Sequence, residues 1–129
     1  MRSQLDELFV YAKDYLGSEP EYLWDSYPDA CVLRHQDNKK WHAVIMHISR
    51  SKLGLSGEDI VDILDVKCDP QLLGSMLGKE GCHPAYHMNK SHWLTVRLDG
   101  TVPFDEIVGL LEMSYNITKK KLTRRTNCD

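Results

Sequence analysis

The chain has 129 residues, of which 42% are hydrophobic and 27% charged, and its formal net charge is −3. This length and balance are typical of one globular domain with one sizeable core. No apolar run approaches the roughly 20 residues of a transmembrane helix, and the acidic balance excludes a protein that coats DNA through a general surplus of basic residues.

The N-terminus and the cysteines indicate the compartment. Residues 1–7 are too polar for a secretory signal peptide. The four cysteines form no C-x-x-C pair, and reduced thiols are the default for a chain without a secretory signal. We therefore expect a cytoplasmic protein with free thiols.

The first predicted element is an amphipathic helix over Ser3–Leu16. Its apolar residues recur at steps of three and four, which places them on one face. Ser3 is a candidate N-cap with Asp6 three residues later. Gly17 supplies a left-handed stop at the other end of the helix.

Three strands are predicted next, at Ala30–His35, Trp41–Ile48 and Asp59–Cys68. The polar run 36–40 is typical of a hairpin turn, so the first two strands should pair in antiparallel fashion. The third strand alternates apolar and polar residues, which places Asp65 and Lys67 on the face away from its apolar residues.

The second half of the chain predicts two helices and a fourth strand. Asp69 as N-cap and Pro70 at the first helical position begin one helix. A loop over Lys79–Ser91 then leads into a strand at Trp93–Leu98. Pro103 begins the last helix, with acidic residues in its first turn.

The order helix, three strands, helix, strand, helix predicts an α+β fold with a mainly antiparallel twisted sheet and helices packed on one face. The second face of the sheet is expected to be partly open, with Trp93 and Arg97 on it. Because the chain shows no repeat and no linker composition, we predict a single domain over residues 1–129. Residues 119–129 are expected to form a frayed basic tail.

Catalytic and metal-binding motifs are weak. His83 and His87 are four residues apart beside Cys82, but Pro84 disfavours the helix that would bring both imidazoles onto one metal ion. Cys82 and His83 are neighbours in an extended segment and point apart, which disfavours a nucleophile–base pair. We therefore predict no metal, no cofactor and no catalytic residue, with an enzyme lacking a sequence motif as the alternative.

The loop and the strand after it concentrate rings, amides and cations that could stack bases or hold phosphates. Candidate binding residues, including two lysines of the 36–40 turn, are Lys39, Lys40, Lys67, Tyr86, His87, Asn89, Lys90, Trp93 and Arg97. The structural alternative is that the polar loop residues hydrogen-bond the backbone of a turn and that the lysines are simply solvated.

Several segments resemble the MmcQ/YjbR family. The matching segments are residues 66–70 (VKCDP), 84–90 (PAYHMNK), 92–100 (HWLTVRLDG), 102–103 (VP) and 114–115 (SY). The resemblance extends from the first helix to Lys121. It implies a compact CyaY-like α+β domain, and members are commonly labelled DNA-binding through a double-wing arrangement of hairpins. The wings would be the 36–40 turn and the 79–91 loop.

The sequence therefore leaves three functional hypotheses open. The first is a binding module for nucleic acid, as the resemblance implies. The second is a protein-interaction module that uses the open sheet face or a sheet edge. The third is a small-ligand protein or enzyme with a pocket beside His87. Expected partners are DNA or a protein, without membrane association, and the chain is expected to be a monomer or weak dimer.

Overall fold

A computed structural model describes residues 3–119 of the chain. In chain order its elements are α1 (Gln4–Leu16), β1 (Cys31–Arg34), β2 (Trp41–Ser49), the 3-10 helix η1 (Arg50–Leu53), β3 (Ile60–Lys67), α2 (Pro70–Leu77), β4 (Cys82–Pro84), β5 (Trp93–Arg97) and α3 (Phe104–Thr118). The strands form one five-stranded sheet in the order β1-β2-β3-β5-β4, and every neighbouring pair is antiparallel. The predicted α+β fold is confirmed.

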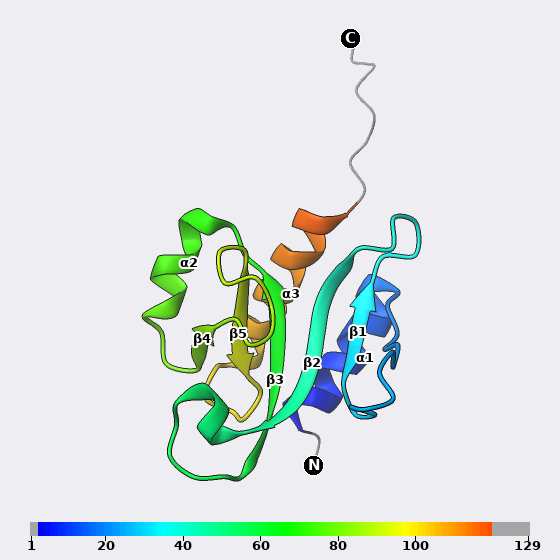
Figure 1. Cartoon of the computed structure of the whole chain (residues 1–129). Helices are drawn as coiled ribbons and strands as arrows, with labels where there is room; N and C mark the ends of the chain where they lie inside the picture. The colour runs from blue at the N-terminus through cyan, green and yellow to red at the C-terminus, as the bar shows by residue number, and fades with distance from the viewer. Residues whose placement is uncertain (1–2, 120–129) are drawn as a thin grey trace.

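The helices cover one face of the sheet, as predicted, with α1 and α3 behind the sheet in the view of Figure 1. The main core lies between these helices and the alternating apolar residues of the strands. Its fully buried side chains include Leu8 of α1, Ile45 of β2, Leu64 of β3 and Leu111 of α3. Burial of these side chains supplies the main favourable free energy of folding.

Local signals place the helix ends where the sequence predicts them. The Ser3 hydroxyl accepts from the backbone N–H of Asp6, and the Asp6 carboxylate accepts from the backbone N–H of Ser3, so the capping box is complete. Gly17 takes a left-handed conformation with φ 64° at the end of α1. Asp69 caps α2 by accepting from the backbone N–H of Gln71 at 2.9 Å.

The face of the sheet opposite the helices, which we call the second face, is more covered than expected. It carries a smaller apolar cluster formed by Val32, Val44, Ala85 and Trp93, with Trp24, Trp41, Met46 and Met88 packed against it. Two irregular segments, residues 21–30 and 85–92, supply the members that do not come from strands. The open part of this face is therefore what remains between these two segments.

The sequence misses one strand. Cys82–Pro84 forms β4 inside the segment predicted to be a loop, and it pairs with Leu94–Val96 of β5 at the edge of the sheet. Three residues are too few to show an alternating pattern, and a proline usually ends a strand assignment. Of the predicted basic tail, residues 120–129 lie outside the described part of the chain.

Within residues 3–119, no helix combines the length and the apolar character that crossing a bilayer requires.

Gly81 joins α2 to β4. A substitution at this position measures how tightly the β4 edge of the sheet is packed. Its φ is 92°, and a Cβ atom placed there would lie 2.6 Å from the Val102 side chain. We expect Gly81→Ala to lower the free energy of unfolding by about 2–4 kcal/mol, through backbone strain and overpacking together. Urea denaturation measures the change.

Gly74→Ala is the matched control. Gly74 lies inside α2, and an added Cβ there would meet no atom within 4 Å. Alanine is favoured over glycine in a helix interior by about 1 kcal/mol, so this variant should be as stable as the parent or more stable. Equal effects of the two substitutions would contradict the assigned packing at Gly81.

Candidate functional site: an aromatic groove on the second face

A groove of about 540 Å³ lies on the second face. Three parts of the chain form it: the segment 24–30, the strand β2 and the segment 86–88. Its lining residues are Trp24, Ser26, Tyr27, Pro28, Asp29, Ala30, Trp41, Val44, Met46, His47, Ile48, Tyr86, His87 and Met88. Most of these side chains are aromatic, apolar or thioether groups, so the groove has a largely apolar interior.

Strand β2 forms the floor. Val44, Met46 and Ile48 lie two residues apart and therefore point to the same side of the sheet. Val44 is 2% exposed, whereas Met46 is half-buried and borders the open space. A register irregularity between Leu33 and Arg34 shifts the pairing so that Arg34 lies opposite Trp41.

The first wall is the segment 24–30. The Trp24 and Trp41 rings have centroids 5.8 Å apart and planes at 87°, an edge-to-face pair between wall and floor. The segment is anchored before Trp24 by a two-bond backbone bridge from Glu21 to Val32 of β1. At its far end the His47 Nε2 atom lies 3.1 Å from the carbonyl oxygen of Asp29.

The second wall is the segment 86–88, and a hydrogen bond to β5 helps to hold it in place. The backbone N–H of Tyr86 donates to the Thr95 hydroxyl oxygen at 2.8 Å. Ala85 beside it is fully buried in the second-face cluster. His87 adopts the left-handed region with φ 62°, which few residues other than glycine adopt, and its ring lies 4.2 Å from the Tyr86 ring.

The Thr95 hydroxyl in turn donates to the Asp65 carboxylate. Asp65 is fully buried, and its Oδ2 atom has no hydrogen-bond partner within the described residues. Burial raises the pKa of Asp65 to about 7, although the Thr95 hydrogen bond and the Lys90 charge act in the opposite direction. The strand pattern correctly predicts the face that Asp65 occupies, but it does not predict that a loop covers this carboxyl group.

Two of the predicted binding residues line the groove. These are Tyr86 and His87, which are half-buried and exposed respectively. Asn89 and Lys90 are exposed in the same loop, and the Asn89 side chain accepts from the backbone N–H of Ser91 at 2.8 Å. That contact is the turn-stabilising role of the structural alternative.

The remaining lysines lie outside the groove lining. Lys39 and Lys40 are exposed in the turn between β1 and β2, and Lys39 has a left-handed φ of 64°. Lys67 is half-buried at the end of β3, opposite Trp93. The prediction that these lysines bind a ligand stays a prediction.

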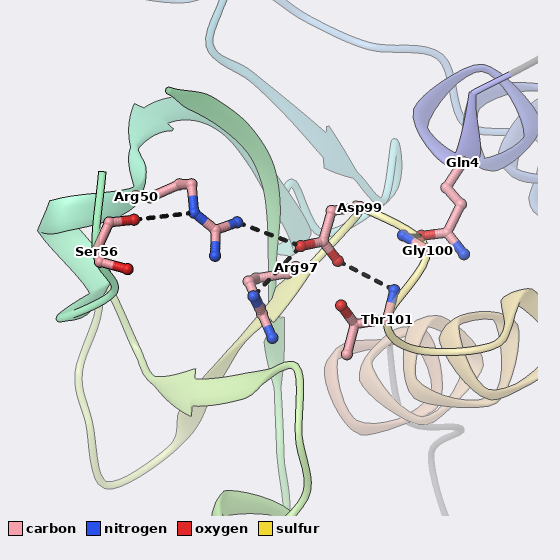
Figure 2. Close-up of polar contacts among 7 residues, drawn as sticks. All are labelled: Gln4, Arg50, Ser56, Arg97, Asp99, Gly100 and Thr101. Atoms are coloured by element: carbon pink, nitrogen blue, oxygen red, sulfur yellow. Dashed lines mark hydrogen bonds and ion pairs between the residues drawn. The ribbon is translucent and has the colours of Figure 1, made fainter. Parts of the chain in front are cut away.

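Trp93 and Arg97 lie on the second face but are buried. Trp93 is 9% exposed and packs in the second-face cluster, so its ring offers little surface for stacking. Arg97 is 6% exposed and its guanidinium lies 3.3 Å from the Asp99 carboxylate. Figure 2 shows that Arg50 reaches the same carboxylate from η1, at 3.8 Å.

The Asp99 carboxylate therefore serves as the shared partner of these two arginines. Burial raises its pKa, but hydrogen bonds from Thr101 and the Arg97 charge together hold the pKa below its ordinary value. The Thr101 backbone N–H donates to Asp99 at 3.1 Å, and the Gly100 N–H donates to Gln4 of α1 at 3.0 Å (Figure 2). Since Arg97 already has an ionised partner, its structural role accounts for its burial.

The sequence reasoning missed most of the groove. Trp24, Tyr27, Trp41, Met46 and Met88 were not among the candidates, although Trp24 and Tyr27 lie close together in an irregular segment. That clustering is the available signal, because aromatic residues outside regular elements need a surface to pack against. The sequence does not show that the segments around residues 24 and 88 meet across β2.

The expectation that the chain holds no metal ion stays a prediction. Across residues 3–119, no three His, Cys, Asp or Glu side chains are grouped closely enough to hold a metal ion. Cys82 is buried, and burial raises the pKa of its thiol. A raised pKa disfavours the thiolate form that acts as nucleophile or metal ligand.

Residues 14–117 match the family model described as YjbR. The chain belongs to the YjbR family. Among its relatives, a Bacillus subtilis protein with the name Uncharacterized protein YyaQ is 40% identical over 114 residues, which cover 88% of this chain and 97% of that protein. The Escherichia coli protein YjbR is 50% identical over 32 residues, covering 25% of this chain and 27% of that protein.

Solved structures confirm that the YjbR fold applies to nearly the whole chain. A crystal structure of a Pseudomonas syringae protein has a TM-score of 0.87 and 42% sequence identity, covering 92% of this chain and 100% of that chain. A Deinococcus radiodurans protein has a TM-score of 0.70 and 26% identity, covering 95% and 84%. The resemblance noted in the sequence is thus confirmed at the level of family and fold.

Asp65 gives the stability of this YjbR-family protein a specific pH dependence. The folded carboxyl group keeps its proton up to about pH 7, whereas in the unfolded chain it ionises near the ordinary value of 3.8. The free energy of unfolding therefore falls as the pH rises from about 4 to 7. Asp65→Asn removes this dependence, and the variant should become more stable than the parent above pH 7, by up to about 4 kcal/mol.

The measurement is urea denaturation of parent and variant at several pH values, compared as a difference. The difference matters because burial lowers the pKa of His42 to about 4, which makes stability rise with pH in the same window. This opposite contribution is common to both proteins and cancels. Asp14→Asn, at an exposed position of α1, is the control. A difference that stays constant from pH 4 to 8 would rule out the assigned protonation of Asp65.

Proposed function

We propose that this YjbR-family protein is a ligand-binding module whose ligand occupies the groove between the segment 24–30, β2 and the segment 86–88. The observation that carries the proposal is a cavity of about 540 Å³ lined mainly by rings and apolar side chains. This volume falls within the roughly 300–1,000 Å³ of typical small-molecule sites. It also corresponds to the sequence hypothesis of a pocket beside His87.

The walls are preorganised, which supports binding. The segment 24–30 is tied to the sheet through the Glu21–Val32 bridge and through the side-chain contact of Glu21 with Arg34 at 2.7 Å. The segment 86–88 is tied to β5 through Thr95. Because both walls are attached to strands, little conformational entropy is lost when a ligand enters.

The polar groups of the groove are few and placed at its rim. His47 is fixed by the Asp62 carboxylate at 2.6 Å and by the Asp29 carbonyl group. His87 and Ser26 are exposed at the groove. An apolar interior with a small number of oriented polar groups is the usual composition of a site for organic ligands.

A thermal-shift screen with metabolite-sized compounds tests the proposal. A ligand at about 100 times its Kd stabilises the folded state by about 2.7 kcal/mol, which raises the Tm of a domain of this size by roughly 10 °C. Trp24→Ala should weaken binding of each hit at least about tenfold, because it removes one ring of the wall.

Tyr15→Ala is the matched control, since Tyr15 is an aromatic residue of α1 that is 74% exposed and lies outside the groove lining. It should leave the affinity of each hit unchanged. Hits that bind equally well to Trp24→Ala and to the parent would place the ligand elsewhere. A library without hits would count against the proposal.

Nucleic-acid binding is the second candidate, and the exposure of Lys39, Lys40 and Lys90 favours it. Lysines on these two loops could contact phosphates, as the family resemblance implies. Fluorescence titration with single- and double-stranded DNA at two salt concentrations tests it. We expect a Kd tighter than about 100 μM at low salt that weakens with added salt.

Replacing Lys39, Lys40 and Lys90 by Gln should abolish that affinity and its salt dependence, whereas Trp24→Ala should leave the salt dependence in place. Absence of measurable affinity at low salt would dismiss the nucleic-acid candidate. A protein partner stays a prediction as well, and the groove is the part of the second face that a projecting apolar side chain could enter.

A further inference from the structure

We infer that the groove selects an organic cation, namely a quaternary or protonated amine with apolar substituents. This inference rests on the proposed ligand-binding function and names the class of ligand. It depends on three properties of the lining: the arrangement of its rings, its thioether groups and the sign of its charge.

The rings present faces from different directions. Trp24 and Trp41 pack edge to face, with an interplanar angle of 87° at 5.8 Å, so the faces that this contact leaves free point in different directions. Tyr86 belongs to the opposite wall, and Tyr27 is 70% exposed at the rim. Aromatic faces carry a negative quadrupole that attracts cations within about 6 Å of the ring centre.

The thioethers of Met46 and Met88 add polarizable surface between the rings. The ring and thioether surfaces themselves offer no strong hydrogen-bond acceptors to replace the tightly held water of a bare primary ammonium or a metal ion. A cation whose charge is spread over alkyl groups loses less hydration on entry. The alkyl groups also gain from contact with the apolar interior.

The charged residues of the lining also favour a cationic ligand over an anionic one. Among residues 3–119, the groove lining includes the acidic residue Asp29 and contains neither Lys nor Arg. A second carboxylate, that of Asp62, lies directly behind His47 at 2.6 Å. A phosphate or carboxylate ligand would therefore enter a groove that has an acidic residue in its lining and no lysine or arginine to pair with.

The lysines considered for nucleic acid do not alter this conclusion. Lys39, Lys40 and Lys90 are exposed outside the lining, and Lys90 lies close enough to Asp65 to act on its pKa. The two proposals thus concern different surfaces. The aromatic groove favours a cation, and the lysine-bearing loops favour an anion.

The experiment compares three probes of one shape by NMR titration of the intact chain. The first probe is choline. The second is its neutral isostere 3,3-dimethylbutan-1-ol, in which carbon replaces the nitrogen. The third is 3,3-dimethylbutanoate, the carboxylate with the same carbon skeleton as the isostere. Cation–π contacts contribute about 1–2 kcal/mol, so choline should bind about 5–30-fold more tightly than the neutral isostere. The carboxylate should bind most weakly. Shifted signals should include the Trp24 and Trp41 indoles.

Two variants separate the contribution of the Asp29 charge from that of the Trp24 ring. Asp29→Asn should reduce the preference for choline over its neutral isostere, with little change in the affinity for the isostere itself. Trp24→Leu keeps an apolar wall but removes a ring, so it should reduce the preference further. Asp14→Asn and Tyr15→Leu, both exposed on α1 and outside the groove, should leave all affinities unchanged.

The outcomes distinguish this inference from the proposed function. If the neutral isostere binds at the groove as tightly as choline, or the carboxylate binds better, the cation assignment is overturned while ligand binding in the groove stands. If none of the three probes shifts any groove signal at concentrations up to tens of millimolar, the cation assignment is also overturned. The metabolite screen then decides the proposed function separately.

Discussion

The groove depends on one buried hydroxyl group, that of Thr95. It accepts from the backbone N–H of Tyr86 at 2.8 Å and donates to the carboxylate of Asp65, so one side chain of β5 joins the loop to β3. A backbone N–H under a covering loop needs a partner, and the hydroxyl supplies one to the N–H of Tyr86 and to one oxygen of the buried Asp65 carboxyl group. Together with the burial of Ala85 and the packing of Met88, this link holds the segment 86–88 against the sheet as the second wall of the groove.

The second face thereby divides into two regions with different chemistry. Toward β1 and β2 it is aromatic and open, with Trp24 and Trp41 at the groove. Toward the β5–α3 connection it is charged and closed, because Arg50 and Arg97 share the Asp99 carboxylate (Figure 2). In the closed region the Asp99 carboxylate is shared by two guanidinium groups, and in the open region the rings have free surface. Binding is therefore expected where polar groups are scarce.

The sequence predicts the fold well because its signals are local. The capping box at Ser3, the Asp69–Pro70 helix start and the 36–40 turn each act within a few residues, and the periodicity of the strands assigns their faces correctly. The groove could not be predicted from such local signals. Trp24 and Met88 are far apart in the chain, and their approach across β2 follows from tertiary packing that no local pattern contains. For the same reason Trp93 looks like a surface ring in the alternating pattern, whereas a loop covers it.

The DNA-binding mode that the sequence resemblance implies and the aromatic groove involve different surfaces, and the difference has a physical basis. A double-wing mode of DNA binding requires cations on both projecting loops, and exposed lysines are present there, but the aromatic groove has Asp29 in its lining and no lysine or arginine. Bases can stack on exposed aromatic faces only if the adjoining phosphates avoid carboxylates. An organic cation meets no such conflict, since the same rings and the same carboxylate both attract it. The charge at residue 29 is therefore the feature that most clearly separates the two readings of this surface.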